Sequence, residues 1–173
     1  MKTFISILLS LAMAISGFFG NIFAKPEEPA ISTAQPSVTD LVYIPDKTDI
    51  ELFNAVNEAR EAFGKEPPLR LDPELCRFAY IRAQEQLFEK GHFRPNGTRF
   101  ISVFNENNYK CNKAGENICI IGDSSTYSPQ KVTELWLNSQ SHKDIMIREY
   151  WQKTGIAVFF NDGKVYCVQL FVC

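Results

Sequence analysis

Two histidines, His92 and His142, are the residues of this chain best suited to chemistry near neutral pH. Imidazole transfers protons in this range and, when neutral, is a common metal ligand. No HExxH or CxxC motif accompanies the histidines, so their spacing alone does not identify a site. Each could instead be a polar side chain that is hydrogen-bonded within the fold. The elements that carry them therefore decide whether they act together.

No nucleophile stands out beside the histidines in the sequence. Ser139 and Ser141 flank His142, but neither lies on the strand-to-helix turn that exposes the serine of a nucleophile elbow. A histidine could still act as a general base toward a metal-bound water. We therefore favour a binding function over an enzymatic one, and a metal-dependent hydrolase is the enzymatic alternative.

His92 follows a predicted helix and precedes a predicted turn. The helix begins at Asp72, with a proline in its first position, and ends at Gly91. The turn is predicted at 95–97, where the sequence reads Pro-Asn-Gly. His92 would then lie at a helix C-terminus, where the helix dipole favours a cation.

The rest of the pattern predicts more helices, followed by a hairpin near the end of the chain. A first helix is predicted from Thr48 to Gly64, with Thr48 as its cap and Glu51 as the capping-box partner. The remaining elements are helices capped by Thr98 and Ser128, a strand at 117–121 and two strands flanking a turn at 161–163. This order predicts an α+β fold in which packed helices cover a small, mainly antiparallel sheet.

The N-terminal segment differs from the rest of the chain. Residues 1–24 carry one charge, Lys2, followed by an uncharged apolar stretch, which is typical of a secretory signal peptide cleaved after Ala24. The same stretch is long enough to span a bilayer at roughly 20 residues, so an uncleaved anchor is the alternative and the one expected membrane contact. Residues 25–48 are proline-rich and are predicted to be a flexible linker, leaving 49–173 as the folded domain.

The composition is that of an ordinary soluble globular protein. Hydrophobic residues make up 45% and charged residues 22% of the chain, and the net charge is −2. Because there is no basic excess, nucleic acid is not an expected partner. The chain is long enough to form one domain with a substantial core.

All five cysteines follow the signal segment, and an exported protein is expected to form disulfides. Five is an odd number, so at least one thiol is free or bonds another chain. Cys167 and Cys173 lie six residues apart in a predicted strand, about 20 Å when extended, which is too far for a bond. The other pairings stay open, although Cys76 lies in a predicted helix and could be a buried thiol. The odd cysteine leaves a structural role at the cell surface as a further hypothesis.

Five segments, in this order, resemble the CAP superfamily, the SCP-like extracellular proteins related to cysteine-rich secretory proteins, antigen 5 and pathogenesis-related proteins. They are "LFNAVNEAR", "HFRPNGTRF", "AGENI", "LWLNSQSHKDIM" and "TGIAVFF". The resemblance covers roughly Asp49 to Val172, and the motifs are closest to the bacterial branch. It implies a three-layer α-β-α sandwich. It also implies a cavity lined by His92, Glu116 and His142 that holds zinc or another divalent cation.

The chain departs from the family pattern at several positions. Many members have a second acidic residue at the position of Ser139, so the implied ligand set is His92, Glu116 and His142 with water completing the tetrahedron. Gln140 and Ser141 replace the usual Pro-Gly, and aspartate replaces asparagine at position 144. Glu116 has a structural alternative, because a Gly-Glu-Asn turn before a strand could serve only the backbone.

The resemblance implies a secreted or cell-surface binding or interaction module. Its expected partners are a lipid, a peptide or a cell-surface component, because members of the family bind sterols and fatty acids. A lipid- or sterol-binding protein and a metal-dependent hydrolase are the alternatives. In the hydrolase, His92 or His142 would act as the base and Glu116 would polarise a metal-bound water.

Overall fold

The computed structural model describes residues 43–173. The predicted signal peptide, residues 1–24, and most of the predicted linker therefore lie outside the described residues. Within residues 43–173, no helix is both long and apolar enough to cross a membrane. The folded part, expected from Asp49, begins with a helix at Lys47.

A four-stranded sheet forms the centre of the fold, with the order β1-β3-β4-β2. Its strands are β1 (Arg70–Leu71), β2 (Ala114–Ile121), β3 (Lys153–Asn161) and β4 (Lys164–Val172). β4 is antiparallel to both β2 and β3, whereas β1 is parallel to β3. The sheet is therefore mixed, because a two-residue parallel strand extends an otherwise antiparallel arrangement.

The β3–β4 hairpin forms as the Asp-Gly sequence predicts. Asn161 pairs with Lys164, which leaves Asp162 and Gly163 as a two-residue loop. Both loop residues have positive φ, 48° and 68°, as the twist of a tight hairpin requires. The hairpin supplies the two central strands, so residues of both strands contribute to the apolar clusters on the two sides of the sheet.

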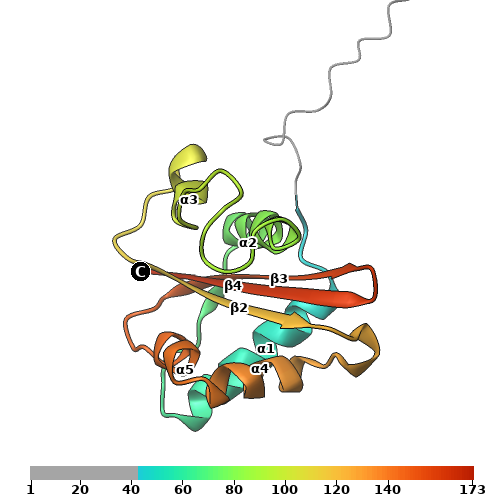
Figure 1. The fold of residues 1–173 in the computed structure, drawn as a ribbon. Coiled ribbons are helices and arrows are strands. Elements are labelled where there is room, and N and C mark those ends of the chain that lie inside the picture. The colour runs from blue at the N-terminus through green and yellow to red at the C-terminus, as the bar shows by residue number, and fades with distance from the viewer. Residues whose placement is uncertain (1–42) are drawn as a thin grey trace, which may run out of the picture. The chain divides into compact units, whose positions relative to one another are not determined.

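Helices cover both faces of the sheet, which confirms the predicted α-β-α sandwich (Figure 1). One layer contains α1 (Lys47–Ala62), α4 (Pro129–Asn138) and α5 (Gln140–Met146), and the other contains α2 (Pro73–Glu85) and α3 (Ser102–Glu106). A separate buried apolar cluster lies on each side of the sheet. At Gly155 a Cβ would lie 2.1 Å from the backbone carbon of Leu75, so α2 packs with its backbone directly on β3.

The first helix starts one residue earlier than predicted and has a different cap. Asp46, not Thr48, is the N-cap, and its carboxylate accepts the N–H groups of Thr48 and Asp49. Asp49 completes the capping box in place of Glu51. Buried Asp49 also accepts the N–H of Val158 at 2.8 Å, so the same residue that closes the helix start fastens α1 to β3.

Three other helix boundaries also differ from the predictions. α2 begins at its predicted cap, Asp72, but ends at Glu85, well before Gly91. α3 begins at Ser102 without a side-chain cap, so Thr98 does not cap it. The helix after Ser128 is capped as predicted, yet it is interrupted at Ser139, whose extended backbone separates α4 from α5.

Candidate histidine site

Glu116 lies on β2, within the segment that the sequence predicted as a turn. β2 begins at Ala114, three residues before the predicted strand, so Gly115 and Glu116 are strand residues rather than turn residues. The Glu116 side chain is fully buried, and its two oxygens have separate partners. One accepts from Arg82 Nε at 2.8 Å and the other contacts His92 Nδ1 at 2.8 Å.

Arg82 extends from α2 and neutralises this buried carboxylate. Its guanidinium is also fully buried, and it donates to Glu85 at 2.6 Å and to the Gly91 carbonyl at 2.7 Å. A buried ion pair requires such additional hydrogen bonds to offset the desolvation of both charges. Arg82 therefore links three parts of the site: helix α2, the loop before His92 and strand β2.

The loop that carries His92 is held by its backbone. The Gly91 N–H donates to Gln86 Oε1 at 2.7 Å, and the Gly91 carbonyl accepts from Gln86 Nε2 at 3.0 Å. Because the buried Gln86 side chain bonds both backbone groups of Gly91, the chain turns back after Gln86. This contact explains why α2 ends before the predicted boundary. Gly91 has φ +99°, a conformation that glycine adopts without strain. The His92 carbonyl accepts the Phe100 N–H at 2.8 Å and closes the loop.

His142 is positioned from the other layer of the sandwich. It lies in α5, its Nδ1 is 2.9 Å from the Ser139 hydroxyl, and its carbonyl accepts from Asn117 Nδ2 at 3.1 Å. Ser139, which occupies the position of the missing acidic residue, thus contacts the imidazole directly. Burial lowers the pKa of His142, and the neighbouring His92 lowers it further. His142 is therefore neutral at neutral pH.

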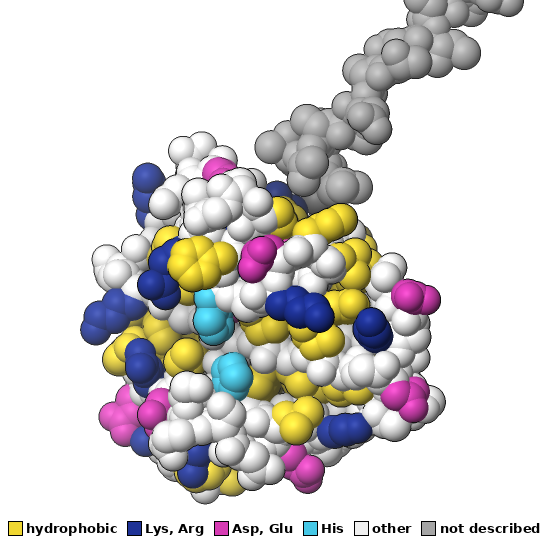
Figure 2. Space-filling view, viewed as in Figure 1, with side chains coloured by type: hydrophobic (Ala, Val, Ile, Leu, Met, Phe, Trp, Pro, Cys, Tyr) yellow, Lys and Arg dark blue, Asp and Glu magenta, His cyan; other side chains and the backbone are white. Residues whose placement is uncertain are grey.

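β2 brings the two histidines together from opposite faces of the sheet. Consecutive strand residues point to opposite faces, so Glu116 reaches the α2 layer while Asn117 reaches α5. β2 is an edge strand of the sheet, so the histidine from one helical layer and the histidine from the other lie near each other at this edge. Figure 2 shows the two histidine side chains next to each other on one face, with hydrophobic and basic side chains beside them.

Both imidazoles use Nδ1 for contacts within the protein and leave Nε2 without a protein partner among residues 43–173. Because the Glu116 carboxylate accepts hydrogen bonds, Nδ1 of His92 is the donor, and the neutral ring then presents the Nε2 lone pair, as in carboxylate–histidine–metal arrangements. Of the three residues predicted to bind a metal, the structure thus offers two imidazole nitrogens, with Glu116 behind one of them. Within the described chain, no group of three or more His, Cys, Asp or Glu side chains is arranged to hold a metal ion.

Sequence reasoning missed Arg82 and the role of Ser139. Arg82 lies between Ala79 and Ala83, the small residues of the buried α2 stripe, and a cation beside such a stripe indicates an internal partner. The sequence indicated Ser139 only as a neighbour of His142 outside any nucleophile elbow and as a departure from the family pattern. Its contact with His142 depends on the break between α4 and α5. No capping side chain or proline in the sequence indicates that break.

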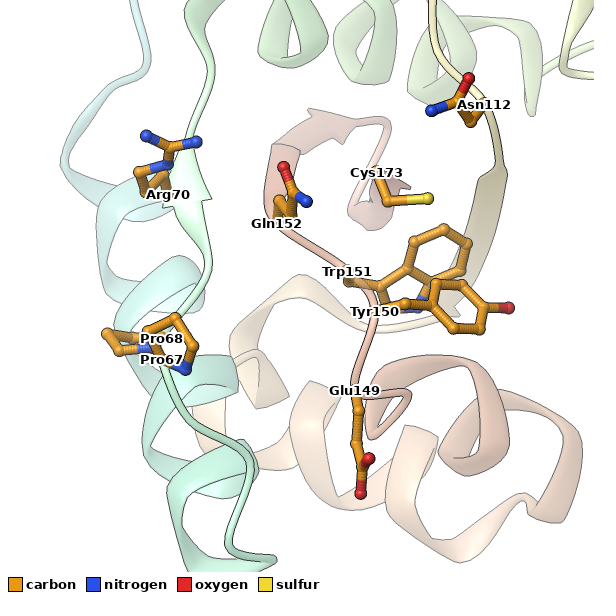
Figure 3. Close-up of a pocket in the computed structure, with 9 residues that line it drawn as sticks. All are labelled: Pro67, Pro68, Arg70, Asn112, Glu149, Tyr150, Trp151, Gln152 and Cys173. Atoms are coloured by element: carbon orange, nitrogen blue, oxygen red, sulfur yellow. The ribbon is translucent and has the colours of Figure 1, made fainter.

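A separate cleft of about 800 Å³ opens at one end of the sheet (Figure 3). Pro67, Pro68 and Arg70 lie on one side of it, and Tyr150 with Asn112 on the other. Its volume is in the range of small-molecule pockets. The histidines do not line it, so this cleft is distinct from the histidine site.

All five cysteines lie in the described part of the chain, and no S–S bond joins any two of them there. Burial raises the pKa of Cys76 to about 12 and that of Cys119 to about 11. Thiols with such pKa values carry little thiolate at neutral pH and are poor metal ligands or nucleophiles. The cysteines therefore do not extend the histidine site.

Comparison with known proteins points to one family. A family model described as the cysteine-rich secretory protein family matches residues 53–173, which is most of the chain and all of the site. No curated protein matches the chain in sequence.

Several solved structures share the fold at low sequence identity. An outer surface protein from Borrelia burgdorferi is 23% identical with a TM-score of 0.63, over 75% of this chain and 95% of that one. An extracellular SCP-domain protein from Bacillus anthracis is 20% identical with a TM-score of 0.60, over 72% of this chain and 40% of that one. NaASP2, solved with Zn²⁺, is 16% identical with a TM-score of 0.53, over 75% of this chain and 83% of that one.

Proposed function

Because the chain belongs to the CAP family of cysteine-rich secretory proteins, we propose that it is an extracellular binding module in which His92 and His142 hold a divalent cation. The observation that carries this proposal is the shared use of Nδ1. Glu116 and Ser139 occupy that nitrogen in the two rings, so both Nε2 atoms are left for a ligand. The names of similar proteins, an outer surface protein and an extracellular protein, support the location.

The donor set fits zinc or a similar borderline cation. Neutral imidazole suits zinc, copper and nickel, and the lowered pKa keeps His142 neutral. Glu116 and Ser139 would orient the rings from behind, in place of acting as ligands themselves. Two protein ligands leave the rest of the coordination shell to water or to a partner molecule. A bound cation would supply a Lewis-acidic contact for oxygen or nitrogen groups of that partner.

The surface beside His92 supports a binding role. Phe88 and Phe93 are 79% and 53% exposed, and Leu87 is also exposed. Exposed large apolar side chains that gather in one segment mark interaction surfaces more often than single ones do. A partner that docks on this segment would lie beside the imidazole of His92, which is itself 44% exposed.

The metal-dependent hydrolase receives less support from the same geometry, because Arg82 and His92 hold both oxygens of Glu116, the residue that would polarise a metal-bound water. A hydrolase with Ser139 as its nucleophile is also poorly supported. The Ser139 hydroxyl lies 2.9 Å from His142 Nδ1, a distance typical of a nucleophile and its base. A triad also needs a third group that orients the base through its other nitrogen. Among the described residues, no carboxylate bonds His142, and Glu116 is held by Arg82 and His92.

Calorimetric titration of the full chain with zinc chloride tests the proposal. We expect one equivalent to bind to the unchanged protein, and uptake to disappear in a His92→Ala/His142→Ala variant. Cobalt added in place of zinc should give a spectrum without thiolate-to-metal charge transfer, which separates the histidines from the five cysteines. If the double variant binds zinc as well as the unchanged chain does, the proposal is refuted.

A further inference from the structure

Two cysteines of the sheet lie directly opposite each other on neighbouring strands. Cys119 on β2 is the register partner of Cys167 on β4, and the two strands are antiparallel. Directly opposite residues in such a pair have Cα atoms about 4.5 or 5.5 Å apart, depending on the hydrogen-bonding position. Both distances fall within the range of about 4.4–6.8 Å that a disulfide spans.

The two side chains also point to the same side of the sheet. Both belong to the apolar cluster that α1 and α4 cover, together with Leu52, Val132 and Trp136. Cys119 is 8% exposed and Cys167 is fully buried. Burial raises the pKa of Cys167 and the neighbouring Cys119 raises it further, which agrees with thiols that lie close together.

The other three cysteines are placed differently. Cys76 lies in α2 and is therefore separated from Cys119 and Cys167 by the sheet. Cys111 precedes β2 and Cys173 follows β4, so both lie outside the paired strands, although they are near enough that, besides burial, Cys173 raises the pKa of Cys111. Among the five, Cys119 and Cys167 are thus the pair that strand register holds face to face.

We propose that Cys119 and Cys167 form a disulfide across β2 and β4 when the chain folds in an oxidising compartment. The oxidant is a molecule that itself carries a disulfide, such as oxidised glutathione. The bond ties the edge strand of the sheet to its neighbour, three residues after Glu116. The strand that positions both histidines is then anchored covalently as well as by hydrogen bonds.

The exchange proceeds in two balanced steps. The Cys119 thiolate attacks one sulfur of the oxidant, forms a mixed disulfide and releases one thiolate of the oxidant. The Cys167 thiolate then attacks the Cys119 sulfur, forms the S–S bond and releases the second thiolate. The two cysteines lose two protons and two electrons in total, and the oxidant is reduced to two thiols. Both steps take place during folding, before the sheet is covered, because burial in the folded protein raises the pKa of both thiols and leaves little thiolate to react.

Peptide mapping of the full chain tests the proposal without any substitution. Protein unfolded and reduced, then refolded with oxidised glutathione, is alkylated under denaturing conditions and digested without reductant. We expect one linked peptide pair that contains Cys119 and Cys167, and an alkylated Cys76. Alkylation of both Cys119 and Cys167 in the refolded protein overturns the proposal.

Thermal unfolding gives an independent readout. A disulfide between Cys119 and Cys167 closes the long loop between these residues and stabilises the fold by restricting the unfolded chain. Reductant should therefore lower the Tm of the oxidised protein by roughly 10 °C. Reductant should leave the Tm of a Cys119→Ala variant unchanged, while a Cys76→Ala variant should still respond. An equal response of all three proteins contradicts the proposal. Because the zinc titration uses only histidine variants, either result can fail without the other.

Discussion

Replacing Glu116 by glutamine should destabilise the protein far more than a surface change of the same kind. The substitution keeps the shape of the side chain and removes its charge, so the fully buried guanidinium of Arg82 loses its partner on β2. The new amide would also direct its NH₂ toward Arg82 or His92, both of which donate to Glu116. A buried charge that loses its partner costs about 3–5 kcal/mol, and because Arg82 keeps Glu85, we expect a cost at the lower end of this range, about 3 kcal/mol.

That free energy is large enough to measure without ambiguity. Urea unfolding followed by circular dichroism gives the free energy of unfolding, and the Tm should fall by about 10–15 °C for a domain of this size. The control is Glu51→Gln, which breaks the ion pair with Lys47 on the solvent-facing side of α1. Because those side chains are 48% and 89% exposed, we expect a change below about 0.5 kcal/mol.

A second variant distinguishes the cost of an unpaired buried charge from the cost of changed packing. Arg82→Met/Glu116→Leu removes both charges together, so no unpaired buried charge is left, and it should recover part of the lost stability. The reasoning is refuted if Glu116→Gln costs less than about 1 kcal/mol, or if the double variant is less stable than that single one. The first result would mean that water reaches Arg82 in the native state.

Three further predictions follow from the site and the fold. Ser139→Ala should weaken zinc binding by about 10-fold, measured by calorimetry, because His142 loses the hydroxyl that orients it; an unchanged affinity would contradict this role. The pKa of His142 is lower in the folded than in the unfolded state, so its contribution to stability is complete above about pH 6.5 and is lost as pH falls through the folded pKa. Urea unfolding between pH 7.5 and 5 should therefore show a steeper loss in the unchanged chain than in His142→Gln, and equal slopes would refute the assignment. Gly155→Ala should cost about 3 kcal/mol or more because its Cβ would overlap α2, whereas Gly122→Ala, with open space around it, should be nearly neutral; similar unfolding free energies for the two would argue against the close packing.

The sequence predicted the main elements of the fold because local signals mark them. Asp-Gly placed the hairpin, Asp72 and Ser128 placed two helix starts, and the order of elements indicated an α+β fold, whereas the α-β-α sandwich came from the family resemblance. Boundaries were wrong where a side-chain contact competes with the local stop or cap signal. Gln86, which turns inward to hold Gly91, is one such case.

The contacts of the candidate site residues could not be predicted from the sequence, and their role as metal ligands stays a prediction. His92, Glu116 and His142 were named from the family resemblance, and the structure brings each of them to β2 or to a segment bonded to it. The partners of Glu116 could not be read from the sequence, because Arg82 reaches it across 34 positions of the chain. Whether the site binds a cation stays a prediction for the titration to decide.

The β3–β4 hairpin follows the other described helices and strands in chain order, and this order has a consequence for when the fold can form. β1 pairs with β3, β2 pairs with β4, and α2 packs on both hairpin strands, so every layer needs residues 153–172 to be present. A nascent chain that lacks this last segment has no sheet to cover and stays open. For a protein that crosses a membrane in an extended form, this order of assembly would delay folding until the chain has reached the far side.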